Sequence, residues 1–167
     1  LIKGGIFLEQ GRWMKRLALD KTGTITYGRP PQTDFVVLDS IAADTSSALA
    51  ASLASRSDHP VSRAIAEEAR INHVRLLPLD DFAAIPGQGV TGLFRGEKWY
   101  LGNLRMVQEL EISSSGLEKQ IKRLEEQGKT VVVLVGPAGA QALFAVADTV
   151  KKSSIEAVAA LKKLGIK

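Results

Sequence analysis

The sequence contains no cysteine and only 5% aromatic residues. Without cysteine, a disulfide framework and a thiolate metal site are excluded. A membrane-spanning helix is not expected either. The longest apolar stretch, residues 131–147, is interrupted by Gly136-Pro137-Ala138-Gly139, and this predicts two strands at residues 130–135 and 141–147 joined by a turn.

Charge of one sign does not dominate the chain. It carries 22 Lys and Arg against 18 Asp and Glu, for a net charge of +4 in 167 residues. Because the basic residues are scattered among acidic ones and few aromatics lie between them, no nucleic-acid partner is expected. The mild positive charge also suits phosphates or nucleotides. The length allows one sizeable core or two small ones.

The most informative segment is Asp20-Lys21-Thr22-Gly23-Thr24, which follows the apolar residues 17–19. The apolar residues predict a short buried strand, which places Asp20 at the carboxyl edge of a sheet, where open α/β folds bind ligands. A carboxylate there can attack a terminal phosphoryl group and form an acyl phosphate. Lys21, backbone N–H groups near Gly23 and a bound Mg²⁺ would neutralise the transferred charge.

Continued by Ile25-Thr26, this pentapeptide resembles the phosphorylation motif of P-type ATPases. The resemblance implies a catalytic set made of Asp20, Lys21, Thr22, Gly23 and Thr24. It also implies that Asp20 and Thr22 ligate Mg²⁺, with the remaining ligands outside the chain. The family's later Thr-Gly-Asp and Gly-Asp-Gly-x-Asn-Asp segments do not occur here.

The residue at position 22 helps to distinguish a P-type ATPase from a simple phosphatase. Simple phosphatases of the haloacid-dehalogenase-like fold carry a second aspartate two residues after the nucleophile, as general acid and base. This chain has Thr22, which cannot do that work at neutral pH. The sequence therefore favours a phosphoenzyme that persists. A phosphatase of that fold and a non-catalytic nucleotide-binding regulatory module remain open as alternatives.

The chain is expected to contain one domain that is interrupted by another, because the turn-forming segment Gly28-Arg29-Pro30-Pro31 resembles a hinge between two domains. The resemblance implies a phosphorylation domain in two pieces, residues 1–28 and 148–167, around a nucleotide-binding insert, residues 29–147. The expected fold class is α/β, with an antiparallel-sheet insert flanked by helices inside an incomplete haloacid-dehalogenase-like Rossmannoid domain. Helices are expected at residues 6–13, 42–53, 60–71, 103–110, from 115 onward and at 153–164; further β structure is expected at 35–39 and 82–101. The helix from residue 115 is expected to open with a capping box at Ser115-Gly116-Leu117-Glu118 and to carry an apolar stripe of Leu117, Ile121 and Leu124.

A second motif is Ser57-Asp58-His59-Pro60. Pro60 suits the first turn of a helix, with Ser57 or Asp58 as its cap. At the positive end of that helix His59 is expected to be neutral, and a flat ring with one donor and one acceptor can contact a purine. The segment resembles the Ser-x-His-Pro motif of the heavy-metal-transporting branch, type IB, which implies that His59 and Pro60 bind ATP.

Two glycine-containing segments follow in the order that the branch uses for its nucleotide pocket, and they imply ATP contacts from Gly87, Gly89, Val90, Gly102 and Asn103. One position departs from the pattern. Ala54 stands where the branch commonly has a glutamate that accepts from the adenine amino group. If Ala54 faces the pocket, that acceptor is lost. The acceptor is then replaced by a neighbouring polar side chain, Ser52, Ser55, Ser57 or Asp58, or adenine is held by packing and backbone.

Together these features predict the ATP-binding and phosphorylation portion of a heavy-metal P-type ATPase that exports a divalent metal through an aspartyl phosphate. ATP and Mg²⁺ are the expected cofactors. The pump's own actuator and transmembrane domains, absent here, are its expected partners, at the cytoplasmic face of the cell membrane. The isolated chain is expected to be soluble and to bind ATP without sustained turnover.

Overall fold

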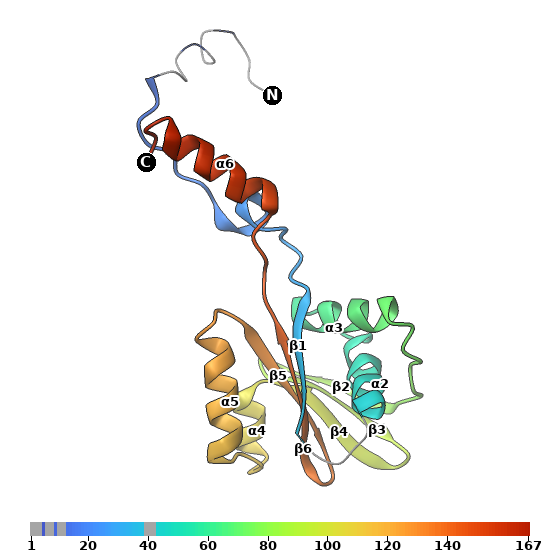
Figure 1. Cartoon of the computed structure of the whole chain (residues 1–167). Coiled ribbons are helices and arrows are strands. Elements are labelled where there is room, and N and C mark those ends of the chain that lie inside the picture. The colour runs from blue at the N-terminus through green and yellow to red at the C-terminus, as the bar shows by residue number, and fades with distance from the viewer. Residues whose placement is uncertain (1–4, 6–8, 10–12, 39–42) are drawn as a thin grey trace. The chain divides into compact units, whose positions relative to one another are not determined.

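The computed structural model describes residues 5, 9, 13–38 and 43–167. The chain divides into two compact units (Figure 1). Unit 1 consists of residues 1–28 and 148–167, and unit 2 of residues 29–147. The helix predicted at residues 6–13 lies largely outside the described residues. No helix in the described part of the chain is long and apolar enough to cross a membrane.

Unit 2 is built on a six-stranded antiparallel sheet with the order β1-β6-β5-β4-β3-β2. Its strands are β1 Gln32–Val37, β2 Asp80–Ile85, β3 Gly89–Phe94, β4 Glu97–Gly102, β5 Thr130–Gly136 and β6 Gly139–Val146. The first strand of the unit therefore pairs with the last one. The predicted antiparallel sheet is confirmed, and β1 begins three residues before the predicted strand at residue 35.

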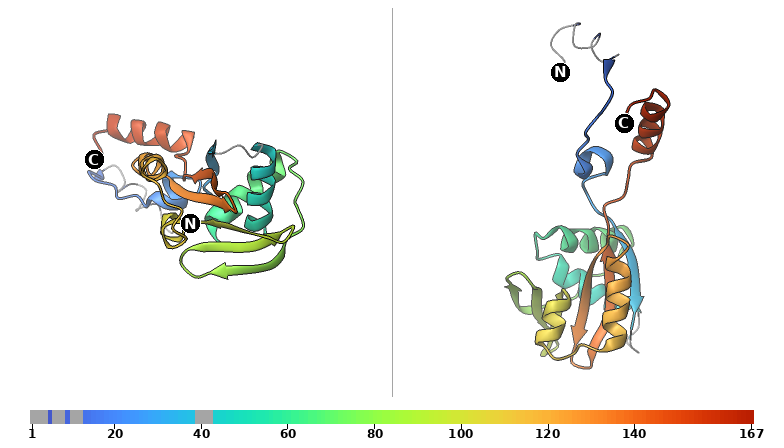
Figure 2. Two further views of the ribbon diagram at one scale, coloured as in Figure 1. Left: turned by 90° about the horizontal axis from the view of Figure 1, so that it is seen from below. Right: turned by 90° about the vertical axis from the view of Figure 1, so that its left-hand side faces the viewer.

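Helices cover both faces of this sheet, as Figures 1 and 2 show. They are α2 Ala43–Ala54, α3 Pro60–Ile71, α4 Leu104–Glu109 and α5 Ser115–Glu125. One core cluster packs α2 and α3 on the sheet, and a second packs α4 and α5 on the opposite face. The result is a three-layer α/β/α unit with the sheet in the middle.

The long apolar stretch forms β5 and β6 in the interior of the sheet. Successive side chains of a strand point to opposite faces. Phe144 and Val146 accordingly join the cluster under α2 and α3, while Leu143 and Ala145 join the cluster under α4 and α5. A strand covered on both faces needs apolar residues at every position, which explains why the sequence here is continuously apolar.

The helix starts differ in detail from the prediction. The capping residue of α5 is Ser114, whose hydroxyl accepts a hydrogen bond from the Leu117 N–H at 3.2 Å. The predicted capping box at Ser115 is therefore wrong by one residue, and Glu118 accepts from the Ser113 hydroxyl instead. The predicted apolar stripe is confirmed, since Leu117 and Ile121 are buried.

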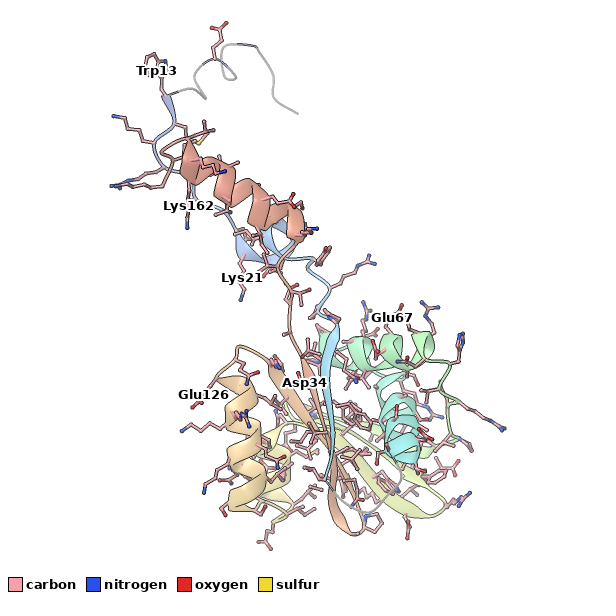
Figure 3. All side chains as sticks on the ribbon, in the orientation of Figure 1. Trp13, Lys21, Asp34, Glu67, Glu126 and Lys162 are labelled. Carbon is pink, nitrogen blue, oxygen red and sulfur yellow. The ribbon has the colours of Figure 1, made fainter. Side chains whose placement is uncertain are left out.

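A partly buried ion pair ties β1 to the residue before β5. Lys129 Nζ lies 2.7 Å from Asp34 Oδ2, and the side chains are 19% and 28% exposed (Asp34 is labelled in Figure 3). The hydrogen bond from Lys129 and, next, that from Thr33 hold the pKa of Asp34 below its ordinary value. A carboxylate with a lowered pKa adds stability above the unfolded-state pKa of about 4, and this stability is lost as the pH falls through the folded-state pKa.

We therefore expect Asp34→Asn to lower the free energy of unfolding of unit 2 by about 1 kcal/mol at neutral pH. The difference from wild type should shrink as the pH falls through the lowered folded-state pKa of Asp34, because both forms are then neutral. Urea denaturation across this pH range is the measurement. Glu67→Gln is the matched control, because the Glu67–Arg70 pair is solvent-exposed and its loss should leave stability nearly unchanged. Equal losses in the two variants would contradict the role of Asp34.

Unit 1 contains α6, Lys152–Lys163, and the segment around the predicted phosphorylation motif. The prediction of a buried strand at residues 17–19 is wrong for this structure, since Leu17 and Leu19 are 37% and 42% exposed. The physical reason lies in the pairing. Leu17 N–H donates to Lys167 C=O at 2.8 Å and Lys167 N–H donates to Lys15 C=O at 3.0 Å, which is one rung of a parallel ladder and leaves the rest of the segment without strand geometry.

Candidate functional site

The first candidate site is the turn that follows Asp20. Thr22 has φ −75° and ψ 122°, and Gly23 has φ 76° and ψ −22°. These angles define a type II turn, whose third position requires positive φ and so favours glycine. The backbone at Asp20 is extended, and Asp20 and Lys21 are both exposed; Figure 3 shows Lys21 projecting from the turn. The motif thus presents a carboxylate and an ammonium group to solvent from one tight turn.

Three residues outside the predicted catalytic set hold this turn. The buried Thr26 hydroxyl accepts from the Gly23 N–H at 3.3 Å and hydrogen-bonds to the carboxylate of Asp148. Lys151 Nζ donates to the Gly23 carbonyl at 2.7 Å. Sequence spacing could not connect Thr26 with Asp148, because 122 residues separate them. The available signal is a polar residue, Asp148, two residues after the end of the apolar strand β6.

The residues around the turn offer only part of a Mg²⁺ site. This ion favours several oxygen ligands in near-octahedral geometry. Among the residues that the structure describes, no group of three or more His, Cys, Asp or Glu could hold a metal. Asp148, the carboxylate bonded to Thr26, also accepts from the Gly28 N–H at 3.2 Å. Asp20 and Thr22 therefore remain the predicted ligands, and they fit Mg²⁺ only with further oxygen atoms from elsewhere.

The second candidate site begins at His59, which is itself the N-cap of α3. Its Nδ1 accepts a hydrogen bond from the Val61 N–H at 3.3 Å, and Pro60 occupies the first turn as predicted. The prediction that Ser57 or Asp58 caps the helix is therefore wrong. Ser57 instead accepts from the His59 N–H, and Asp58 forms an exposed ion pair with Arg63.

This cap changes what the ring can offer a ligand. An Nδ1 that accepts a hydrogen bond carries no proton, so the proton of a neutral ring lies on Nε2. The acceptor that the sequence assigned to a purine contact is already in use. His59 is exposed and retains the Nε2–H donor and the face of the ring for a ligand. His59 can therefore stack on a ligand and donate a hydrogen bond to it, whereas its acceptor atom Nδ1 is already bonded to the first turn of α3.

The glycine segments come together at the junction between the first residue of β3 and the last residue of β4, where Gly89 pairs with Gly102. Asn103 bridges them. Its Nδ2 donates to the Gly87 carbonyl at 2.9 Å, its backbone N–H donates to the Gln88 carbonyl at 2.9 Å, and its Oδ1 accepts from the Met106 N–H at 3.2 Å as the N-cap of α4. Both side-chain polar atoms of Asn103 therefore already have partners within unit 2.

The glycines at this junction differ in what surrounds them. A Cβ on Gly102 would lie 2.5 Å from Met106 Sδ and 2.6 Å from the Gln88 carbonyl oxygen, so this glycine allows close packing. A Cβ on Gly87 would meet no atom within 4 Å, and Gly87 is exposed. Val90 is buried in the core cluster. Of these residues, Gly87 leaves the most open backbone for a ligand.

A carboxylate lies beside the same loop. Glu109 accepts a hydrogen bond from Gln88 Nε2 at 2.8 Å. This bond and, next, that from Arg105 hold the pKa of Glu109 below its ordinary value. Gln88 is thereby fixed to α4 through its side chain and to Asn103 through its backbone.

Ala54 lies where the sequence left two outcomes open. It is fully buried in the core cluster under α2 and α3, so it faces the core. Ser52 cannot replace the missing acceptor, because its hydroxyl donates to the Ala48 carbonyl and accepts from the Leu77 N–H. Ser55 and Asp58 are exposed, and Ser57 is half-buried.

Unit 2 also has two hollows of about 360 and 520 Å³ beside α2 and the end of α3. Neither is lined by a residue of the two predicted sites. Their shared lining includes Asp44, Asn72 and Val74.

Proteins of similar sequence identify the family to which this chain belongs. Residues 14–167 match the model of the haloacid dehalogenase-like hydrolases, and the chain belongs to this family. Over its whole length it is 36% identical to a cadmium-transporting ATPase of Staphylococcus aureus, and over 99% of its length it is 38% identical to the probable copper-transporting ATPase PacS of Synechococcus elongatus. It spans 24% and 22% of those relatives.

The structure narrows the class further. All of the chain superposes on 27% of a zinc-transporting PIB-type ATPase solved in its E2.Pi state, with a TM-score of 0.89 and 29% identity. The chain corresponds to the catalytic and nucleotide-binding region of heavy-metal-transporting P-type ATPases of the PIB branch, which confirms the resemblance drawn from the two motifs.

Proposed function

We propose that unit 2 binds ATP and that Asp20 of unit 1 accepts its γ-phosphoryl group, within a pump that moves a divalent heavy metal outward across a membrane. The observation that carries the proposal is the exposed Asp20 carboxylate immediately before a type II turn that Gly23 permits. Relatives named for cadmium, copper and zinc support a metal cargo, without singling out one of the three.

In the proposed reaction, a carboxylate oxygen of Asp20 attacks the γ-phosphorus. The bond between that phosphorus and the bridging oxygen breaks, and ADP leaves with the bonding electrons. Lys21 lies next in the chain and would offset the charge of the incoming group. Mg²⁺, bound through Asp20, Thr22 and ligands outside this chain, would supply further neutralisation. Thr22 cannot activate water, so the acyl phosphate would persist long enough to drive a change of state.

In unit 2 we propose that the Nε2–H and ring face of His59, with Pro60 beside it, contact the purine. The open backbone at Gly87 and the adjoining Gly89, Val90, Gly102 and Asn103 would form the wall that the nucleotide approaches. The support is the exposure of His59 and Gly87 and the hydrogen bonds that join Gly87 to Asn103. The cytoplasmic face of the membrane and the pump's actuator and transmembrane domains belong to this proposal for the complete pump.

The test is titration of the chain with ATP, followed by calorimetry and by backbone amide shifts. We expect His59→Asn to weaken ATP binding several-fold, about the effect of one lost contact, while leaving stability unchanged. Asparagine is a good N-cap, so it replaces the acceptor of His59 without its ring. His73→Asn is the matched control, since His73 is the other of the two histidines and lies exposed beyond α3.

Two results would contradict the proposal. Wild-type ATP affinity in His59→Asn, with the same amides perturbed, would remove His59 from the site. Sustained ATP hydrolysis by this chain would show that the reaction does not need the Mg²⁺ ligands that we place elsewhere.

A further inference from the structure

The segment that returns from unit 2 fastens the phosphorylation turn at several points. Asp148 is the first residue of this segment in unit 1. One carboxylate oxygen hydrogen-bonds to the Thr26 hydroxyl at 2.5 Å and the other accepts from the Gly28 N–H at 3.2 Å. Thr26 is fully buried and Asp148 is half-buried, so the hydrogen bond between them is partly shielded from water. A charged acceptor in such a place holds its donor more firmly than a neutral one does.

The Thr26 hydroxyl connects this carboxylate to the turn. It accepts from the Gly23 N–H and also lies 3.0 Å from the Lys21 carbonyl oxygen. A hydroxyl has one proton, and the charged Asp148 is the stronger acceptor for it. With its proton directed at Asp148, the hydroxyl keeps a lone pair for Gly23. Without Asp148, the proton would turn to the Lys21 carbonyl.

Lys151 acts on the other side of the turn. Its Nζ donates to the carbonyls of Gly23 at 2.7 Å and Thr24 at 3.3 Å, and its backbone N–H donates to the Ile25 carbonyl at 2.9 Å. In a trans peptide the N–H points opposite to the carbonyl of the same plane. The Thr24 N–H, which shares its plane with the Gly23 carbonyl, is therefore directed away from Lys151.

We propose that Asp148, acting through Thr26, and Lys151 are positioning residues that hold the turn Lys21–Ile25 in the conformation needed for phosphoryl transfer to Asp20. This inference rests on the proposed role of Asp20. A preformed turn presents N–H groups and Lys21 to the transferred group without reorganisation during the reaction, which is the most effective form of charge stabilisation. The residues that hold the turn, Thr26, Asp148 and Lys151, come from both pieces of unit 1 and lie outside the predicted catalytic set. The residues that they contact in that set are Lys21, Gly23 and Thr24.

The test measures ¹⁵N relaxation of the turn in the whole chain without nucleotide. We expect the order parameters of Gly23 and Thr24 to fall from about 0.8 to below about 0.6 in Thr26→Val and in Asp148→Asn. Thr26→Ser keeps the hydroxyl and should restore the wild-type values. Lys151→Met should loosen the turn, whereas Lys152→Met, which changes the neighbouring exposed lysine, should not.

The readouts separate positioning from general stability. Under the proposal, the order parameters of α6 stay at wild-type values in every variant. Loss of order throughout α6 in Asp148→Asn would overturn the inference, since Asp148 would then hold the unit and not the turn. Unchanged order at Gly23 and Thr24 in both Thr26→Val and Asp148→Asn would overturn it as well. Because the measurement uses no ATP, its failure is distinct from a failure of ATP binding.

Discussion

Replacing Gly89 by alanine is expected to lower the free energy of unfolding of unit 2 by about 3 kcal/mol, at the upper end of the usual cost of overpacking. A Cβ at this position would overlap the carbonyl oxygen of Leu101 and lie 2.5 Å from the Cα of Gly102. Both obstacles are backbone atoms of β4, the strand that pairs with β3 at this point. They cannot move without separating two interior strands of the sheet.

Chemical denaturation followed by circular dichroism measures this effect. Gly116→Ala is a control of opposite sign, because Gly116 lies in α5 and an added Cβ would meet no atom within 4 Å. Alanine there should stabilise the helix by about 0.5 kcal/mol or more. If Gly89→Ala unfolded at the wild-type denaturant concentration, the close approach of β3 and β4 would be refuted. The glycine would then have to be explained by its ligand alone.

Ala54→Glu is expected to destabilise unit 2 by about 3 kcal/mol or more and to leave ATP affinity in the remaining folded protein unimproved. The heavy-metal branch commonly has glutamate at this position, so the sequence alone allows the opposite result, tighter ATP binding. The structure decides against it, because Ala54 is fully buried among apolar side chains such as Leu53 and Val61. A carboxylate placed there would lose its hydration without gaining a partner.

Ser55→Glu is the matched control, since it adds the same side chain one residue later at an exposed position and should be nearly neutral. Binding of ATP and GTP should be measured together with the unfolding midpoint. Retained stability combined with a several-fold preference for ATP would contradict the buried placement. In that case the glutamate would reach the adenine as it is thought to do in the branch.

Local features of the sequence predicted much of unit 2. The bounds of α3 were predicted residue for residue, because Pro60 marks the first turn and the apolar pattern ends at Ile71. The β5–β6 hairpin followed from the turn residues 136–139. Strand order was beyond such reasoning. Gln32 pairs with Val146, more than a hundred residues away, and no local sequence pattern indicates this pairing of β1 with β6.

The candidate site was predictable where it is contiguous. Asp20 and Gly23 stand within one motif, and the type II turn that follows Asp20 requires the glycine observed. Contacts that depend on packing were not predictable. Which way Ala54 faces depends on the rotation of the last turn of α2, and the choice of His59 over Ser57 as cap depends on a ring nitrogen 3.3 Å from the Val61 N–H.

The pairing of Gly28 with Asp148 has a consequence for the architecture of the whole chain. The last residue of the first piece of unit 1 and the first residue of the second piece are hydrogen-bonded to each other, and Ala147 N–H donates to the Pro31 carbonyl at the corresponding ends of unit 2. Each unit is thus closed where the chain crosses over. Because the two pieces of unit 1 already meet at the crossing, a domain of any length can be inserted there without changing the fold of unit 1. The inserted domain, unit 2, can then diversify in sequence independently.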